Sequence, residues 1–270
     1  MTAILKWAGG KRSLVQAILS TFPLDYESRA FHEPFLGGGA VFFTVKPQRG
    51  TVNDINLRLV NFYRVVRDKP ADLVAEASKY PYDRENYYRL RDRFNNGGLD
   101  TIEDAAILLY LNKTGYNGLY RVNSKGKYNV PFGTYRNPTI VPLEEVYAAS
   151  EALRRVELRS EDFSYLLDAA REGDLVYLDP PYEPLSKTSN FNTYSPTGFP
   201  WEEQVRLSET MQELDKRGVL FTLSNSEPVK KLYRGFKIVT VQVNRSINTK
   251  TASRGPVSEI IVTNIGKPEP

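Results

Sequence analysis

Asp179-Pro180-Pro181-Tyr182 follows directly on the apolar run Leu175-Val176-Tyr177-Leu178. Such a run before a turn is typical of a buried strand that ends at a sheet edge. A carboxylate, two prolines and an aromatic ring would therefore lie together at that edge. The carboxylate can accept from an amino group, and the prolines remove N–H donors, so the Pro180 carbonyl can also face a ligand. Tyr182 offers a ring for a planar base. The combination suits the exocyclic amine of a nucleobase; a proline-stiffened surface turn is the structural alternative.

Around this turn, strands alternate with helices and no repeat is present. Helical spacing of apolar residues occurs at 11–19, 40–45, 56–67, 85–94, 102–112 and 201–216. Strands are expected at about 30–35 and at 51–54, 175–178, 219–223, 237–243 and 259–263. In the helix at 56–67, we expect one buried face formed by Ile55, Leu59, Phe62, Tyr63 and Val66.

This order predicts an α/β fold with a mostly parallel sheet covered on both faces. The last two strands, joined by the basic stretch 244–257, are more typical of an antiparallel pair at one edge. We expect a split α/β domain at about 1–55 and 145–270, interrupted by a largely helical insertion at about 56–144.

Composition excludes several kinds of site. The 270 residues contain no cysteine, so disulfides, thiolate nucleophiles and cysteine-based zinc sites are absent. The single histidine, His32, is expected to pack beside Glu33 rather than act in catalysis, and we expect no metal. The first residues lack a signal-peptide core, and no apolar run approaches the roughly 18 residues that span a bilayer. We therefore expect a cytoplasmic protein without a membrane partner.

Positive charge is gathered in two tracts that contain no acid, although the net charge is only +4. Residues 112–138 hold the basic residues Lys113, Arg121, Lys125, Lys127 and Arg136 and the aromatic residues Tyr116, Tyr120, Tyr128, Phe132 and Tyr135. Residues 228–258 hold Lys230, Lys231, Arg234, Lys237, Arg245, Lys250 and Arg254. Two cationic tracts on a nearly neutral chain indicate a polyanion bound at defined surfaces, with solvated loops as the alternative.

A second candidate site is the segment Glu33-Pro34-Phe35-Leu36-Gly37-Gly38-Gly39, at a predicted strand-to-helix turn. Glycine tolerates positive φ there and lets a ligand approach the backbone. Asp54 ends the next strand, where an acid can bind ribose hydroxyls. The pair favours a cofactor that contains adenosine, either a dinucleotide or S-adenosylmethionine.

The charges near this segment separate the two cofactors. A pyrophosphate would be repelled by Glu33, Asp54 and Asp179, whereas S-adenosylmethionine carries a sulfonium and an ammonium. Lys11 can bind the carboxylate of this methyl donor, and Trp7 can pack against it. We therefore expect S-adenosylmethionine, with S-adenosylhomocysteine as the product.

Seven segments together resemble the Dam-type DNA adenine N6-methyltransferases, whose members typically methylate adenine in GATC. They are residues 5–11 (LKWAGGK), 33–39 (EPFLGGG), 53–56 (NDIN), 116–123 (YNGLYRVN), 132–135 (FGTY), 179–182 (DPPY) and 184–191 (PLSKTSNF). The similarity covers nearly the whole chain in the family's order. It implies a Rossmann-like S-adenosylmethionine-dependent methyltransferase sheet with an inserted, mainly helical DNA-recognition domain. It also implies double-stranded DNA as the partner and action as a monomer.

The resemblance assigns the candidate residues to roles. Trp7, Lys11, Asp54 and Asp179 would contact the methyl donor, and Asp162-Phe163 match the position that holds the cofactor adenine. The remaining donor-site candidates come from the glycine segment and the start of the next helix: Glu33, Pro34, Phe35, Gly37, Gly39 and Ile55. Arg121 would read a guanine of the site and Lys6 the flanking guanine, while Tyr116 and Leu119 would act at the opened base step, with Pro131 nearby. The other DNA-binding candidates are Asn117, Asn123, Lys125, Lys127 and Tyr135.

The expected chemistry uses Asp179, Pro180 and Tyr182. Adenine N6 is a poor nucleophile because its lone pair is shared with the ring. Hydrogen bonds from N6–H to Asp179 and to the Pro180 carbonyl would draw the nitrogen towards tetrahedral geometry. Positioning and preorganised electrostatics would then supply most of the acceleration. The adenine would have to flip out of the duplex and stack on Tyr182.

Three alternatives stay open from the sequence. The same amine chemistry could serve RNA or a protein amide. A cytosine N4 target is disfavoured because enzymes of that kind more often carry serine before the two prolines. A noncatalytic DNA-binding regulator is disfavoured by the intact Asp54, Asp179, Tyr182 and glycines.

Overall fold

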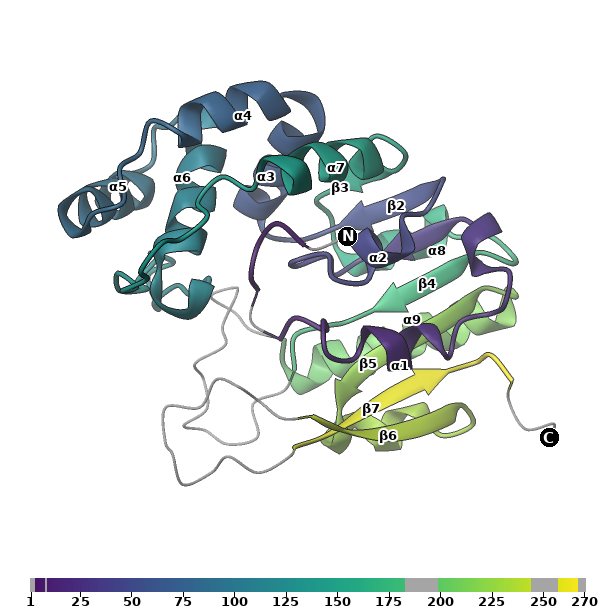
Figure 1. Cartoon of the computed structure of the whole chain (residues 1–270). Helices are drawn as coiled ribbons and strands as arrows, with labels where there is room; N and C mark the ends of the chain where they lie inside the picture. Colours follow the sequence, from purple (N-terminus) through teal and green to yellow (C-terminus); the bar gives the residue numbers. More distant parts are fainter. Residues whose placement is uncertain (1–2, 8, 183–198, 244–256, 267–270) are drawn as a thin grey trace.

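The structure is a computed structural model that describes residues 3–7, 9–182, 199–243 and 257–266 (Figure 1). Seven strands from these residues form one sheet in the order β3-β2-β1-β4-β5-β7-β6. The strands are β1 (Phe31–Glu33), β2 (Gly50–Asn53), β3 (Glu157–Arg159), β4 (Leu175–Leu178), β5 (Leu220–Ser226), β6 (Lys237–Val243) and β7 (Val257–Thr263). Strands β1 to β5 are parallel to one another, and β7 runs antiparallel to both β5 and β6. This arrangement is the predicted Rossmann-like α/β sheet.

Two details of the sheet differ from the expectation. The antiparallel pair is confirmed, but β7 inserts between β5 and β6, so that β6 alone forms the edge. Strand β3 forms the opposite edge and was not predicted, because its three residues are too few to show an alternation.

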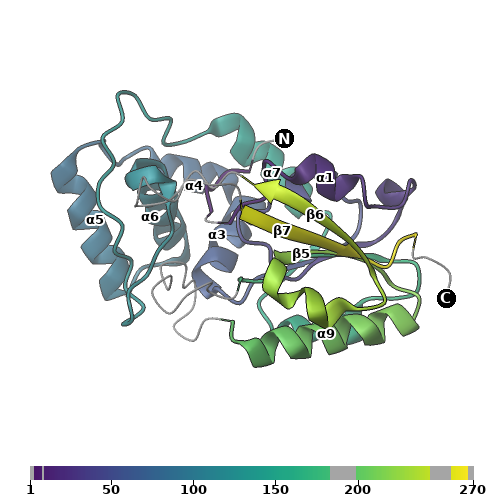
Figure 2. The same ribbon diagram turned by 90° about the horizontal axis from the view of Figure 1, so that it is seen from below.

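The alternation of side chains along the strands divides the core between the two faces of the sheet. Leu175 and Tyr177 of β4 join one buried cluster, and Val176 and Leu178 join the other. Helix α9 (Trp201–Lys216) packs on the second cluster through Leu207, Met211 and Leu214. Helix α1 (Val15–Leu19) covers the opposite face, as Figure 2 shows. It begins later than predicted because Lys11 and Leu14 form a turn (Leu14 N to Lys11 O, 2.8 Å).

The remaining helices lie mainly between β2 and β3 in the sequence. They are α2 (Phe42–Val45), α3 (Leu57–Asp68), α4 (Pro70–Ala77), α5 (Arg84–Asn96), α6 (Thr101–Thr114), α7 (Leu143–Leu153) and α8 (Leu166–Ala169). Short 3₁₀ turns are η1 (Tyr26–Ser28), η2 (Tyr116–Gly118), η3 (Phe163–Tyr165) and η5 (Glu227–Tyr233). Helices α3, α5 and α6 were predicted, whereas α4 and α7 were not.

The N-caps of α3, α5 and α6 explain where these helices begin. The side chains of Asn56, Asp83 and Asp100 accept from backbone N–H groups of the first turn of α3, α5 and α6 respectively. The expected burial of Ile55 on the inner face of α3 is wrong: this residue precedes the cap, and 66% of its surface is exposed. Helix α6 is buried on nearly all sides and forms the centre of the helical part.

The carboxyl ends of the parallel strands point towards the side of the molecule where α5 and α6 lie (Figure 1). Residues that follow β1, β2 and β4 therefore gather at one edge, between the sheet and the helical part. No described helix has both the length and the apolar character that a bilayer crossing requires.

Candidate active site

The turn after β4 is held by partners from two other elements. The hydroxyl of Tyr182 donates to Glu259 Oε2 on β7, at 2.8 Å. The carbonyl of Pro181 accepts from the Gln204 side chain on α9 at 3.1 Å, and Asn225 on β5 in turn donates to Gln204 at 2.9 Å. Gln204 and Asn225 are fully buried. The Tyr182 ring and the Pro181 carbonyl are thus held in place by the protein itself.

Gln204 and Glu259 were both missed from the sequence. Gln204 stands three residues before Leu207 on the apolar stripe of α9, and a polar side chain in that place is a signal of a buried polar contact. Glu259 is the only acid of β7 and is 6% exposed, but nothing in its local sequence indicates its partner.

Lys11 occupies the space in front of this turn. Its ammonium lies 2.7 Å from Asp179 Oδ1, donates to the Gly9 carbonyl at 2.7 Å, and stands 4.6 Å from the centroid of the Tyr182 ring. Only 5% of the Lys11 side chain is exposed. The Lys11 ammonium therefore contacts both groups that the sequence assigns to the target base: Asp179, for its amino group, and the Tyr182 ring, for its plane.

Acidic groups surround this ammonium, and burial changes their proton affinity. Burial raises the pKa of Asp179 to about 6; nearby Lys11 lowers it and Glu259 raises it further. Burial also raises the pKa of Glu33 well above its usual range, with a further rise from Asp179. Among the described residues, Glu33 Oε2 has no hydrogen-bond partner. The site thus holds more carboxyl groups than its one lysine can neutralise, which suits a cationic ligand.

Asp54 ties the glycine segment to the start of α3. Its Oδ2 accepts from Gly37 N and its Oδ1 from Asn56 N, both at 2.9 Å. Gly37 has a φ of +49°, which disfavours any side chain, and a Cβ there would lie 3.0 Å from the Trp7 ring. The hydroxyl of Tyr63 donates to the Gly37 carbonyl at 2.9 Å. Trp7, Gly37 and Asp54 are therefore brought together, as predicted for a donor site.

The other predicted donor-site residues surround this segment. The Pro34 carbonyl accepts from the Asn53 side chain at 3.0 Å, and Gly39 N donates to the Leu36 carbonyl at 2.7 Å. The Phe35 ring lies 5.7 Å from the ring of Phe163. The largely exposed side chain of Ile55 has no part in the packing around them.

Asp162 is engaged by a residue that the sequence analysis missed. Both its oxygens accept from the Arg206 guanidinium, at 2.7 Å each, and Oδ1 also accepts from Ser164 N. These hydrogen bonds, above all that from Arg206, lower the pKa of Asp162. Arg206 also lies 4.0 Å above the Phe163 ring, which packs near Phe199. No sequence pattern links a residue of α9 to position 162.

A second group of predicted residues meets beside the N-terminal segment of the chain, at residues 3–7. Tyr116 N donates to the Pro131 carbonyl at 2.9 Å, and the Tyr135 hydroxyl donates to the Gly115 carbonyl at 2.9 Å. The Lys6 ammonium lies 5.8 Å from the centroid of the Tyr135 ring. Lys6, Tyr116, Pro131 and Tyr135 thus share one surface, on which Tyr116 is 55% exposed. Asn117 has a φ of 56°, a conformation that asparagine tolerates better than most residues.

The basic loop that follows is a short hairpin. Val122 and Tyr128 form an antiparallel bridge, and the Asn123 side chain accepts from Lys125 N and Lys127 N, at 3.0 Å each. Asn123 therefore shapes the turn that exposes both lysines. Arg121 is oriented by the Asn129 side chain, to which its Nε donates at 2.7 Å. Leu119, half-buried, precedes this hairpin.

Some predicted elements lie outside the described residues. They are Ala8 and the segment 184–191 of the family resemblance, and Arg245, Lys250 and Arg254 of the second basic tract.

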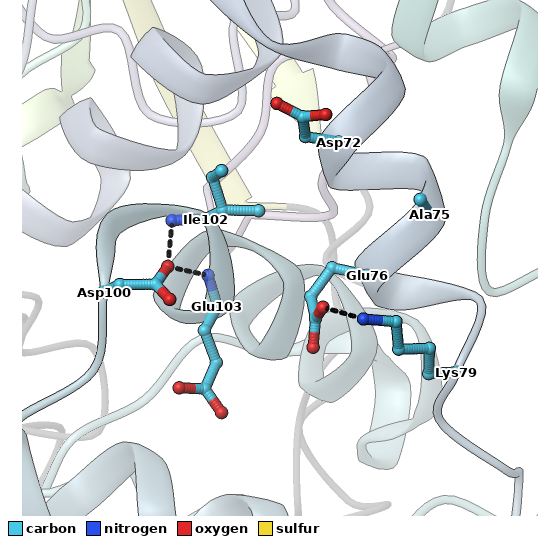
Figure 3. A pocket seen from close by; sticks show the side chains of 7 residues that line it. All are labelled: Asp72, Ala75, Glu76, Lys79, Asp100, Ile102 and Glu103. Carbon is cyan, nitrogen blue, oxygen red and sulfur yellow. Dashed lines mark hydrogen bonds and ion pairs between the residues drawn. The ribbon is translucent and has the colours of Figure 1, made fainter.

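A cavity lies elsewhere, between α4 and the start of α6 (Figure 3), and none of the candidate site residues lines it. Three of the acids that line it have structural partners: Glu76 accepts from Lys79 at 2.6 Å, Glu103 pairs with Arg93, and Asp100 caps α6. Within the described ranges, no three acidic or histidine side chains converge on a point that could hold a metal ion.

Comparisons with known proteins agree on one family. A family model described as D12 class N6 adenine-specific DNA methyltransferase matches residues 7–247. The chain is 42% identical to a type II methyltransferase, M1.LlaDCHI, of Lactococcus lactis subsp. cremoris, covering 97% of this chain and 94% of that one. It is 37% identical to the type II methyltransferase M.MjaIII of Methanocaldococcus jannaschii, covering 96% and 98%. It is 35% identical to the DNA adenine methylase of Escherichia coli strain K12, covering 96% and 94%.

Proposed function

Since the chain belongs to the D12 class of N6 adenine-specific DNA methyltransferases and is such an enzyme, we propose that its site is GATC and that Asp179, Pro180 and Tyr182 carry the reaction. One observation carries this proposal above the others. Asp179 is a largely buried carboxylate at the end of β4, with 19% of its side chain exposed, beside a tyrosine ring whose hydroxyl is fixed by Glu259. These are an acceptor and a stacking surface in adjoining positions.

The three residues have separate tasks. Asp179 and the Pro180 carbonyl accept from the N6 amino group and hold it against the donor. Tyr182 presents its ring to the flipped adenine, since the amine is inaccessible inside a duplex. Gln204 and Glu259 keep the turn rigid, so that little reorganisation is needed when the base enters.

Membership of the family implies S-adenosylmethionine as the methyl donor, and the residues present fit it. The unpartnered oxygen of Glu33 and the surplus of carboxyl groups suit its cationic centres. When bound, the donor supplies an electrophilic methyl group on its sulfonium. Trp7, Gly37, Asp54 and Phe35 would hold the donor, with Asp162-Phe163 near its adenine.

Lys11 has to release Asp179 before a target amine can take its place. The ammonium and an adenine N6 group compete for the same carboxylate and the same ring. We infer that Lys11 turns to the carboxylate of the methyl donor, which offers a replacement for the lost ion pair. When no methyl donor is bound, the ion pair with Lys11 keeps the Asp179 carboxylate from being left buried without a partner, which would be unfavourable.

The DNA-reading residues are proposed on the shared surface of Lys6, Tyr116, Pro131 and Tyr135 and on the hairpin beyond it. Arg121 has the chemistry for a bidentate contact with guanine, and Lys125 and Lys127 for phosphates. The GATC assignment rests on the resemblance of segments 5–11 and 116–135. Action as a monomer is proposed from the family resemblance, and DNA as the substrate supports a cytoplasmic location.

The test is Asp179→Ala, assayed with labelled S-adenosylmethionine and a duplex that contains GATC. We expect transfer to fall by about two to four orders of magnitude, because an acceptor of this kind is worth roughly 10²–10⁴-fold. Asp174→Ala is the matched control, since Asp174 precedes the opposite end of β4 and pairs with His32. Transfer by Asp179→Ala at the level of the control would refute the proposed role. Nucleoside analysis that finds no N6-methyladenine in the wild-type product would refute the reaction.

A further inference from the structure

Asn112 makes contacts that its position in a helix does not explain. It lies near the end of α6 and is 1% exposed. Its Oδ1 accepts from Lys6 N at 3.0 Å, and its Nδ2 donates to the Lys6 carbonyl at 2.8 Å. Nδ2 also donates to the Gly118 carbonyl at 3.0 Å. The side-chain amide thus pairs with the backbone of Lys6 on one side and with the turn η2 on the other.

These contacts join two segments that are far apart in the sequence. Lys6 lies in the N-terminal segment, and Gly118 closes the turn that begins at Tyr116. The two segments also touch directly, because a Cβ on Gly118 would lie 2.4 Å from Lys6 Cδ. Gly118 has a φ of +64°, so glycine is required there for conformation as well as for space. The distance between Lys6 and the turn is therefore fixed by Asn112 and Gly118 together.

The same connection reaches the donor site one residue later. Trp7 stacks on Tyr120, with ring centroids 4.7 Å apart and planes at 17°. On its other side, Trp7 lies against Gly37 and Gly38. Because Trp7 follows Lys6 directly, the pairing of the Lys6 backbone with Asn112 also positions the backbone of Trp7 and therefore its indole ring.

We propose that Asn112 is a positioning residue for site recognition, which holds Lys6 in register with the turn at 116–119. The inference rests on the proposed function, in which Lys6 and this turn contact the DNA site. Asn112 itself is buried and contacts no DNA. Its effect is on which base sequence is accepted, through the spacing of two groups that must read one site together.

The test compares Asn112→Ala and Asn112→Asp with Asn86→Ala. Aspartate keeps the volume and the acceptor for Lys6 N, but it places a carboxylate against the carbonyls of Lys6 and Gly118. The two variants thus separate hydrogen bonding from space filling. Asn86 is the matched control, a 7% exposed asparagine on α5 that donates to the Pro81 carbonyl at 2.9 Å, away from Lys6.

For each protein, kcat/KM is measured on a duplex with the preferred site and on one in which its first base pair is changed. We expect the ratio of the two values to fall about tenfold or more in both Asn112 variants, since one base contact contributes about 1–3 kcal/mol of discrimination. We expect the Asn86→Ala ratio to stay within about twofold of wild type. The dissociation constants for the two duplexes, measured without turnover, should show the same loss of discrimination.

Sequencing of DNA methylated by the wild-type enzyme first identifies the preferred site. A site other than GATC would refute that part of the proposed function, and the ratio is then measured on the site found. An unchanged ratio in Asn112→Ala would overturn the inference, as would an Asn112→Asp ratio equal to wild type. Equal losses of activity on both duplexes, with a lower Tm, would show that Asn112 serves stability alone.

Discussion

At the scale of single residues, the chemistry of the candidate site depends on the protonation of its carboxyl groups. Asp179 pairs with the one lysine, Lys11, and burial raises the pKa of Asp179 and of Glu33. In the proposed mechanism, Asp179 is the group whose ionisation matters most for activity, because its carboxylate form accepts more strongly from the target amine than its protonated form. Its pKa of about 6 lies close enough to neutrality for the surroundings to decide its state.

We therefore expect kcat/KM to rise with pH through about 6 and then level off, because Asp179 loses its proton in that range. The folded protein binds this proton more tightly than the unfolded chain, whose carboxyl group has the ordinary pKa of 3.8. The stability that protonated Asp179 contributes is thus complete below 3.8 and is lost as the pH rises through about 6. The measurement is a pH profile of kcat/KM, accompanied by unfolding at each pH.

Two variants should move this acid limb in opposite directions. Lys11→Met removes the charge that lowers the pKa of Asp179, so the limb should shift to higher pH. Glu259→Gln removes a charge that raises it, while a glutamine oxygen can still accept from Tyr182, so the limb should shift to lower pH. Shifts of the same sign in both variants would mean that the limb belongs to another group.

At the scale of elements, the sequence predicted the helices and strands that carry a clear apolar pattern in their own residues. The run before Asp179 shows a buried strand, and the spacing within 201–216 shows α9, because each carries a full period of apolar residues. Strand β3 has three residues and too little pattern. The place of β7 between β5 and β6 depends on pairing between distant segments, which no local pattern encodes.

The candidate site follows the same division. Asp179, Tyr182, Gly37 and Asp54 stand in segments whose local chemistry is unusual, so the sequence alone marks them as candidates. Gln204, Arg206 and Asn112 act through partners 23 to 106 residues away. An ordinary polar residue on a helix gives no sign of such a partner, so their roles need the folded structure.

The hairpin at 121–129 offers a prediction about DNA affinity. Replacing Lys125 and Lys127 together by glutamine should reduce the slope of log K against log salt by about 1.8, since each phosphate contact contributes about 0.9. The measurement is binding of a duplex at a series of salt concentrations. Lys79 and Lys216, two exposed lysines that each pair with a glutamate three residues earlier, provide a double-glutamine control. A slope that matches the control would remove the hairpin from the DNA interface.

At the scale of the whole molecule, the sheet and the helical part share one core. The larger buried cluster contains Phe31, Val52 and Tyr177 of the sheet together with Leu73 of α4 and Leu108 of α6. Contacts of α3 with α7 and with β3 connect the two parts further. The proposed split into residues 1–55 with 145–270 and residues 56–144 would therefore separate two functional parts of the chain. It would not separate two hydrophobic cores, because both parts contribute to one.

This continuity predicts a single thermal unfolding transition in calorimetry. S-adenosylmethionine at about 100 times its dissociation constant should add about 2.7 kcal/mol of stability and raise the whole transition by roughly 5–10 °C. A dinucleotide such as NAD at the same concentration should leave the Tm unchanged, because its pyrophosphate faces the acids Glu33, Asp54 and Asp179. Two transitions, of which the donor moves only one, would contradict the shared core.

The stack of Trp7 on Tyr120 has a consequence for engineering new specificities. A chimaera that takes its recognition segment from a relative also takes that relative's residue at position 120. The indole ring, wedged between that side chain and the glycines of the donor site, would then meet a different surface. Exchange of the recognition segment should succeed when the N-terminal segment that contains Trp7 is exchanged together with it. Chimaeras that keep the original Trp7 segment should lose affinity for the methyl donor along with the old specificity.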